Sequence, residues 1–272
     1  MMNEMKIRPP AVAGLFYAAS AAGLRSQVQQ LLDQAQVSPL DHVRALIAPH
    51  AGYRYSGPIA ANAFKTLPPL ADSTTTVLLL GPAHHFPVAG VAVSAFDAFG
   101  TPLGAVQVDV QRRAQVLAHG PPFAIFEPAH EDEHCLEVEL PFLQLVLPTA
   151  GIVPLLFGHV DPNIVAAPLI NLLRQADDVL LIVSSDLSHY YPYAQAVALD
   201  RALLDALLSG DGPGVQRRQA CGLLPILTLM EIARQLGWQP HLLDYRNSGD
   251  TAADRSLEGR VRTKCHWFAD AA

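Results

Sequence analysis

The chain has 272 residues, half of them hydrophobic and 16% of them charged. This composition excludes a mainly disordered chain, because such chains are poor in apolar residues and rich in charge. The formal net charge of −7, from 18 Lys and Arg against 25 Asp and Glu, argues against a general attraction to nucleic acid or to anionic lipid. We predict one domain over residues 1–272, with no nucleic-acid or membrane partner.

Apolar segments with helical spacing alternate along the chain with short, wholly apolar segments typical of strands. Strands without polar alternation, such as 77–80 and 179–183, indicate burial on both faces of a sheet. The sequence therefore predicts a single layered α/β domain, with a mostly buried mixed sheet and helices on both faces. In chain order the predicted elements are a helix at 24–35, a strand at 45–48, a helix at 59–67, strands at 77–80 and 91–96, helices at 110–118 and 136–147, a strand at 152–157, a helix at 164–175, a strand at 179–183, helices at 196–208 and 223–236, and strands at 241–245 and 261–268.

The cysteines and the N-terminal segment bear on the cellular compartment. The chain has three cysteines, Cys135, Cys221 and Cys265, and they form no CxxC pair. This usage is typical of a reducing compartment. The N-terminus has no apolar run of signal-peptide length, and prolines break the uncharged stretch 77–96. We therefore expect a cytoplasmic protein.

Three predicted strands are each followed closely by a histidine, namely His50, His84 and His189. A second histidine, His85, comes directly after His84. Ligands of open α/β sheets bind outside the carboxyl ends of the strands, so these side chains are placed where a site is expected. One such histidine alone would be an ordinary loop residue, but three at equivalent places favour one shared site.

Cys221 is the next candidate, because it lies just before the apolar helix predicted at 223–236. A helix N-terminus favours the thiolate form, which is the form that binds metals and attacks electrophiles. A small buried hydrophobic residue is the equally weighted alternative.

Residues 130–134 read His-Glu-Asp-Glu-His and match the HExxH pattern of zinc proteases. Prolines on both sides limit the helix that the pattern needs, and no third ligand follows at a suitable spacing. We therefore predict that His130 binds no metal. His134, Glu133 and Glu137 are expected to line or support a pocket instead.

Several motifs occur in a fixed order along the chain, and this order resembles that of the MEMO family, whose bacterial and archaeal members are called AmmeMemoRadiSam system protein B. The resemblance extends from about Arg8 to the predicted C-terminal strand. The motifs are RPPAVAGLFY at 8–17, IAPHAGYRYSG at 47–57, LGPAHH at 80–85, EDEH at 131–134 followed by Glu137, SSDLSH at 184–189 and ACG at 220–222.

The resemblance implies a fold similar to that of the class III extradiol dioxygenases, which are non-heme iron enzymes. It also implies that His50, His84 and Cys221 bind a metal ion, that His189 is the acid/base group, and that Asp186 lines the site. Further pocket-lining residues are expected to be His85, His134, Glu137 and Tyr53.

Two imidazoles and one thiolate favour iron(II) or copper, with zinc as an alternative. The dioxygenases have a carboxylate where this chain has Cys221, which argues against ring cleavage because a thiolate is softer and can itself be oxidised. Three functions stay open: a metal-dependent oxidoreductase, a non-catalytic module that binds a small molecule or a peptide, and a zinc-dependent hydrolase. The resemblance further implies an association with AMMECR-type and radical-SAM proteins.

Overall fold

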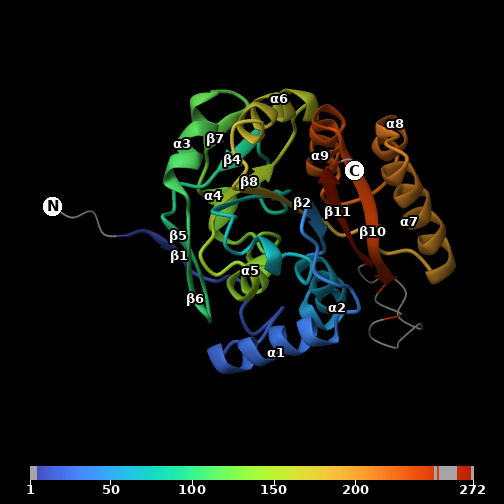
Figure 1. Cartoon of the computed structure of the whole chain (residues 1–272), viewed down its shortest axis with the longest axis horizontal. Coiled ribbons are helices and arrows are strands. Elements are labelled where there is room, and N and C mark those ends of the chain that lie inside the picture. The colour runs from blue at the N-terminus through green and yellow to red at the C-terminus, as the bar shows by residue number, and fades with distance from the viewer. Residues whose placement is uncertain (1–4, 248–249, 251–261, 271–272) are drawn as a thin grey trace.

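The computed structural model describes residues 5–247, 250 and 262–270 (Figure 1). Its main sheet has eight strands in the order β10-β11-β2-β9-β3-β8-β4-β7. The four central strands run parallel to one another, whereas β4, β10 and β11 each pair with a neighbour in antiparallel fashion. The strands are β2 (Val43–Ala48), β3 (Thr76–Pro82), β4 (Val91–Val93), β7 (Phe123–Ile125), β8 (Gly151–Phe157), β9 (Val179–Ser184), β10 (Trp238–Asn247) and β11 (Arg262–Asp270).

Every residue of β3 and of β9 is buried, as wholly apolar central strands require. Successive side chains point to opposite faces, so each strand contributes to two hydrophobic cores. In β2, Leu46 and Ala48 pack into one core, while Ala45 and Ile47 pack into the other.

Helices cover both faces of this sheet. The first core packs against α1 (Ala21–Gln34), α2 (Tyr53–Phe64) and α5 (Leu140–Val146). The second packs against α3 (Val110–Ala118), α6 (Pro162–Leu173), α7 (Tyr193–Leu208), α8 (Gly212–Gln216) and α9 (Leu223–Leu236). Within the described part of the chain, no helix has both the length and the apolar character needed to cross a membrane.

A three-stranded sheet in the order β1-β5-β6 lies beside the main sheet, on the left of Figure 1. Its β1 strand (Ile7–Arg8) carries a fully buried Arg8, whose guanidinium forms an ion pair with Glu137. The N-terminal segment is thereby attached to the loop before α5. The remaining elements are β5 (Ala98–Thr101), β6 (Gly104–Gln107), α4 (Pro128–Glu131) and the 3-10 turns η1 (Pro68–Leu70) and η2 (Glu137–Glu139).

The layered α/β prediction is confirmed, and the differences are local. The helix predicted from residue 59 begins at Tyr53, because Pro58 is accommodated inside its early turns. The strand predicted to 96 ends at Val93, where Ser94 accepts a hydrogen bond from Phe96 N and turns the chain. The helix predicted at 136–147 is divided into η2 and α5. The prediction also missed the short strands β1, β5, β6 and β7, which are too short to show a period.

Candidate metal centre

The strands that precede the candidate residues are neighbours in the sheet. β2, β9 and β3 are adjacent and parallel, so they end at the same edge. His50 follows β2, Asp186 follows β9 and His84 follows β3. The fold therefore brings together three segments that lie far apart in the sequence, at the place where open sheets bind ligands.

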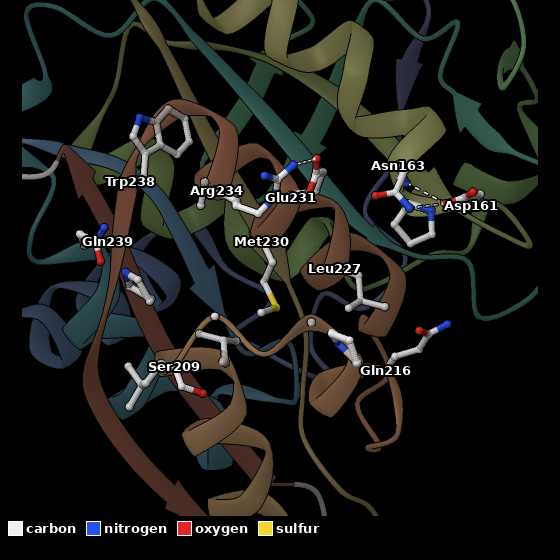
Figure 2. A pocket seen from close by; sticks show the side chains of 18 residues that line it. Asp161, Asn163, Ser209, Gln216, Leu227, Met230, Glu231, Arg234, Trp238 and Gln239 are labelled. Atoms are coloured by element: carbon white, nitrogen blue, oxygen red, sulfur yellow. Dashed lines mark hydrogen bonds and ion pairs between the residues drawn. The ribbon is translucent and has the colours of Figure 1, made fainter.

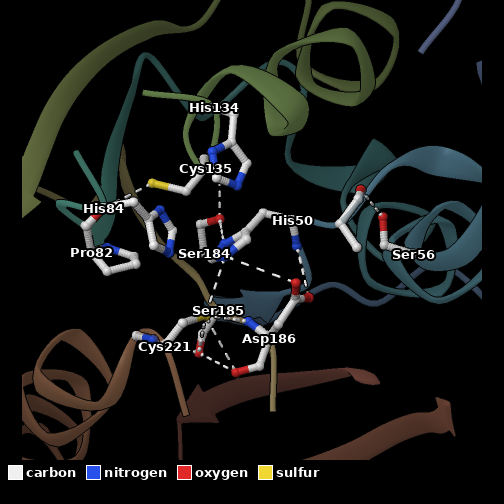
Figure 3. Close-up of polar contacts among 12 residues, drawn as sticks. His50, Ser56, Pro82, His84, His134, Cys135, Ser184, Ser185, Asp186 and Cys221 are labelled. Atoms are coloured by element: carbon white, nitrogen blue, oxygen red, sulfur yellow. Dashed lines mark hydrogen bonds and ion pairs between the residues drawn. The ribbon is translucent and has the colours of Figure 1, made fainter. Parts of the chain in front are cut away.

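Cys221 completes this cluster from the start of α9 (Figure 3). Its Sγ lies 3.2 Å from Nε2 of His50, and the donor atoms of His50, His84 and Cys221 all lie within 4.8 Å of one another. Two donors of one four-coordinate ion, with bonds of about 2.0–2.3 Å, lie roughly 3.2–3.8 Å apart. The His50 and His84 rings are 5.2 Å apart and cross at 80°, which lets their nitrogens converge. The donor types and the 3.2 Å spacing of His50 and Cys221 therefore fit a transition-metal ion, and His84 lies near enough to be its third ligand.

The approach of Cys221 to the sheet depends on Gly222. A Cβ atom at Gly222 would lie 2.6 Å from the Cβ of Ser185 and 2.9 Å from the backbone oxygen of Ser184. The backbone N–H of Gly222 donates to Ser185 Oγ at 3.0 Å, and the N–H of Asp186 donates to Cys221 Sγ at 3.0 Å. The loop after β9 therefore holds the thiol in place.

His50 is held by Ser184, the last residue of β9. Its Nδ1 lies 2.8 Å from Ser184 Oγ, while the hydroxyl donates to the backbone oxygen of Cys135 at 2.6 Å. The hydroxyl proton is directed to this oxygen and to Glu139 Oε1, 2.9 Å away, so Ser184 Oγ accepts a hydrogen bond from the N–H at Nδ1. Nε2 then carries the lone pair and faces Cys221, which is the tautomer that a metal ligand requires.

Burial sets the protonation of these donors. It lowers the pKa of His50 well below its ordinary value, and the neighbouring His84 and His134 lower it further. The His50 ring is therefore neutral at pH 7. Burial, aided by the nearby Asp186 carboxylate, raises the pKa of the Cys221 thiol to about 12. Without a bound metal the thiol is therefore in its neutral form, because desolvation outweighs the helix dipole.

Asp186 and His189 lie in the same loop after β9. Asp186 is buried, accepts the N–H of His50 at 3.1 Å, and has its other oxygen 3.9 Å from His50 Nε2. Burial raises the pKa of Asp186 to about 7. His189 is only partly buried. Burial lowers its pKa, and the nearby His84 also lowers it.

A second group, His84, Glu133 and His134, also has donor atoms within 4.8 Å of one another. The His84 and His134 rings are stacked, with centroids 4.9 Å apart and 20° between their planes. A metal ion binds in the plane of an imidazole ring, and two stacked rings do not direct their lone pairs to one point. Glu133 instead accepts a hydrogen bond from Nδ1 of His84 at 2.8 Å. Hydrogen bonding, not coordination, accounts for this group.

The HExxH pattern does not form a protease site. Helix α4 ends at Glu131, so His130 and His134 do not share a helical face. His130 is 1% exposed, and its Nε2 donates to the backbone oxygen of Ala92 at 3.1 Å. Neither metal-ligand group in the described residues includes His130.

The remaining candidates differ in position. His85 is exposed, and its ring centroid lies 6.5 Å from that of His84 and 6.1 Å from that of His134. Glu137 and Tyr53 are buried, and their polar atoms are bonded away from the histidines. Glu137 accepts from Arg8, Tyr17 and the N–H groups of residues 11 and 12, and Tyr53 donates to the backbone oxygen of residue 138.

A groove of about 540 Å³ lies elsewhere on the molecule, between the starts of α6 and β10 and the helices α7 to α9 (Figure 2). Its surface includes Leu227, Met230 and Trp238. Two of its charged side chains, Glu231 and Arg234, form an ion pair with each other. It includes none of the histidines or cysteines described above, so the metal candidate is not part of it.

Sequence reasoning missed Ser184 and Arg8. Ser184 was visible as the polar residue that ends a buried strand, two residues before Asp186. Nothing in the pattern indicates that Arg8 is buried, because its partners His130, Glu133 and Glu137 follow more than 120 residues later.

Taken together, the mixed sheet and the two-histidine, one-cysteine cluster define an α/β protein with a candidate metal centre at the carboxyl edge of its parallel strands. The family model described as "Memo-like protein" matches residues 8–258. The chain belongs to this family, as the motifs predicted.

Several curated relatives support this assignment. A MEMO1 family protein of Sulfolobus acidocaldarius is 35% identical over 272 residues, covering 92% of this chain and 95% of the relative. Those of Methanococcoides burtonii and Aquifex aeolicus are 35% and 33% identical, each covering 93% of this chain and 97% and 96% of the relative.

Proposed function

We propose that the protein binds one transition-metal ion through His50, His84 and Cys221 and acts as a metal-dependent oxidoreductase on a small molecule. The observation that carries the proposal is the convergence of these three donors at one sheet edge, with His50 Nε2 3.2 Å from Cys221 Sγ. Imidazole and thiolate ligands suit iron(II), copper or zinc and not magnesium or calcium. Three protein ligands leave coordination positions for a substrate.

The bound metal would supply a redox-active Lewis acid beside the substrate. The chain's own groups would orient the ligands and handle protons. Asp186 holds the backbone of His50 and the thiol of Cys221 through hydrogen bonds. His189, partly exposed in the same loop, is neutral at pH 7 and suited to accept a substrate proton.

Metal analysis of protein purified without oxygen tests this proposal. We expect about one iron or copper ion per chain, and oxygen consumption with ascorbate as electron donor that Cys221→Ser abolishes. Zinc retention without oxygen consumption would contradict the redox function and favour the hydrolase. A chain that binds none of the three metals would contradict the metal site and favour a pocket that binds a small molecule or a peptide.

Two further expectations belong to this proposal. Cys135 and Cys221 are free thiols, which agrees with the expected reducing compartment such as the cytoplasm. Association with AMMECR-type and radical-SAM proteins stays a prediction of the family resemblance.

A further inference from the structure

We propose that Glu133 is a positioning residue, which fixes the side-chain rotamer of His84 and keeps the ring proton on Nδ1, so that Nε2 is free for the metal. The inference rests on the proposed function only because it assigns Nε2 of His84 to metal binding. The hydrogen bonds that it invokes belong to the protein without metal.

His84 needs such support more than His50 does. The His50 side chain is 3% exposed and surrounded by the ends of buried strands. The His84 side chain is 28% exposed and lies in a loop, so packing alone leaves its ring free to turn. A side chain that must hold one orientation in such a place requires specific hydrogen bonds.

Glu133 binds His84 at two points. Its Oε1 lies 2.8 Å from Nδ1 of the ring, and its Oε2 accepts the backbone N–H of His84 at 2.7 Å. Oε2 accepts the N–H of His84 and Oε1 accepts the N–H of Cys135, so both oxygens act as acceptors, as those of an ionised carboxylate do. The ring nitrogen facing Oε1 must therefore carry the proton, which fixes the tautomer.

Glu133 is itself held from several sides before any ligand arrives. Its side chain is 1% exposed, and its Oε1 also accepts the backbone N–H of Cys135 at 3.0 Å. Arg8 donates to the backbone oxygen of Glu133 at 2.6 Å. The carboxylate therefore has a fixed position from which to orient a neighbouring ring.

His134 completes the arrangement. Its ring stacks on that of His84, and its Nδ1 lies 3.3 Å from the same Oε1 of Glu133. The Phe16 ring contacts His134 edge-on, with centroids 5.1 Å apart. His84 therefore lies between an acceptor at one ring nitrogen and a supported aromatic face, and turning the ring would break both contacts.

The first experiment uses metal-free protein, so it does not depend on the proposed function. Nitrogen-15 chemical shifts of labelled histidines at about pH 8.5 distinguish the two neutral tautomers, and His84→Gln identifies the signal. We expect His84 to carry its proton on Nδ1 in the wild type and to become a mixture in Glu133→Ala. A wild-type His84 that is protonated on Nε2 would overturn the proposal, whether or not the protein binds metal.

The second experiment measures Co²⁺ affinity by competition with a chelator. We expect Glu133→Ala to weaken binding by about 10–100-fold, as loss of such hydrogen bonds does at other metal sites. Glu133→Gln, which keeps one acceptor oxygen, should lose less and serves if the alanine variant does not fold. The control is Glu131→Ala, an exposed carboxylate two residues away that should leave affinity unchanged. Equal affinity of wild type and both Glu133 variants would overturn the proposal.

Discussion

Nε2 of His50 lies 3.2 Å from Sγ of Cys221, although 171 residues separate them in the sequence. His50 follows a central strand, and Cys221 reaches it from the start of α9. The loop after β9 joins them, because Asp186 bonds to the backbone of one and to the thiol of the other. The spacing of the donors is thus set by the fold, so a metal would meet a site that is already assembled.

The ligand assignment predicts a specific set of losses. His50→Ala, His84→Ala and Cys221→Ser should each weaken Zn²⁺ or Co²⁺ binding by more than about 100-fold, because each removes a direct bond. Far-ultraviolet circular dichroism should stay unchanged, since a core of this size does not need a metal to fold.

Two other histidines provide controls for this series. His85→Ala should weaken metal binding much less, because His85 belongs to neither ligand group in the described residues. His130→Ala should leave the metal stoichiometry unchanged. Full loss of metal in the His130 variant would contradict our assignment and restore the protease interpretation.

Gly222→Ala should damage the site while leaving the fold intact. The added methyl group would meet Ser185 and the backbone oxygen of Ser184 at under 3.0 Å, so the segment that carries Cys221 must move away from β9. We expect at least a tenfold loss of Co²⁺ affinity and a weaker thiolate-to-cobalt absorption band. Gly212→Ala is the matched control, because no atom lies within 4 Å of its added carbon.

The buried ion pair of Arg8 and Glu137 should control stability. Both side chains are fully buried, so Arg8→Met leaves a buried carboxylate without its counter-ion, although Tyr17 and the N–H groups of residues 11 and 12 still donate to it. We expect the free energy of unfolding to fall by about 3–5 kcal/mol. Urea denaturation of Arg8→Met, Glu137→Gln and the double variant forms the measurement. The account would be contradicted if the double variant lost more unfolding free energy than the two single variants lose when their losses are added.

The main elements and the place of the site could be predicted from the sequence because both depend on local patterns. Wholly apolar strands mark the sheet, and histidines directly after them mark its carboxyl edge. The roles of Arg8 and Ser184, and the particular contact of Glu133 with His84, depend on segments that are distant in the sequence, and no periodicity encodes these contacts. The sequence left two alternatives for Cys221 for the same reason, since burial, which decides its protonation, is a property of the whole fold.

His130 should make the protein sensitive to acid. Burial lowers its pKa from 6.5 to about 4, and its Nδ1 has no hydrogen-bond partner, so protonation would bury an unpaired N–H group. Between about pH 6.5 and pH 4 the unfolded chain binds a proton that the folded chain does not, so stability falls as the pH falls.

The effect can be isolated with His130→Gln, which keeps a donor for the Ala92 oxygen but does not titrate. The wild type should lose about 2 kcal/mol more unfolding free energy than this variant between pH 7.5 and pH 5. Equal losses in the two proteins would show that His130 is not buried in the neutral form.

Metal binding should release one proton, and that proton should come from Cys221. Because the pKa of the thiol is about 12 without metal, Cys221 is protonated at pH 7, whereas a metal ligand must be a thiolate. His50 is already neutral and contributes no proton. The logarithm of the Zn²⁺ association constant should therefore rise by about one for each pH unit between pH 7 and pH 9.

Calorimetric titration in buffers of different ionisation enthalpy measures the released protons directly. We expect about one for the wild type and close to none for Cys221→Ser. A wild-type protein that binds Zn²⁺ without releasing a proton would mean that the thiol is already ionised or is not a ligand.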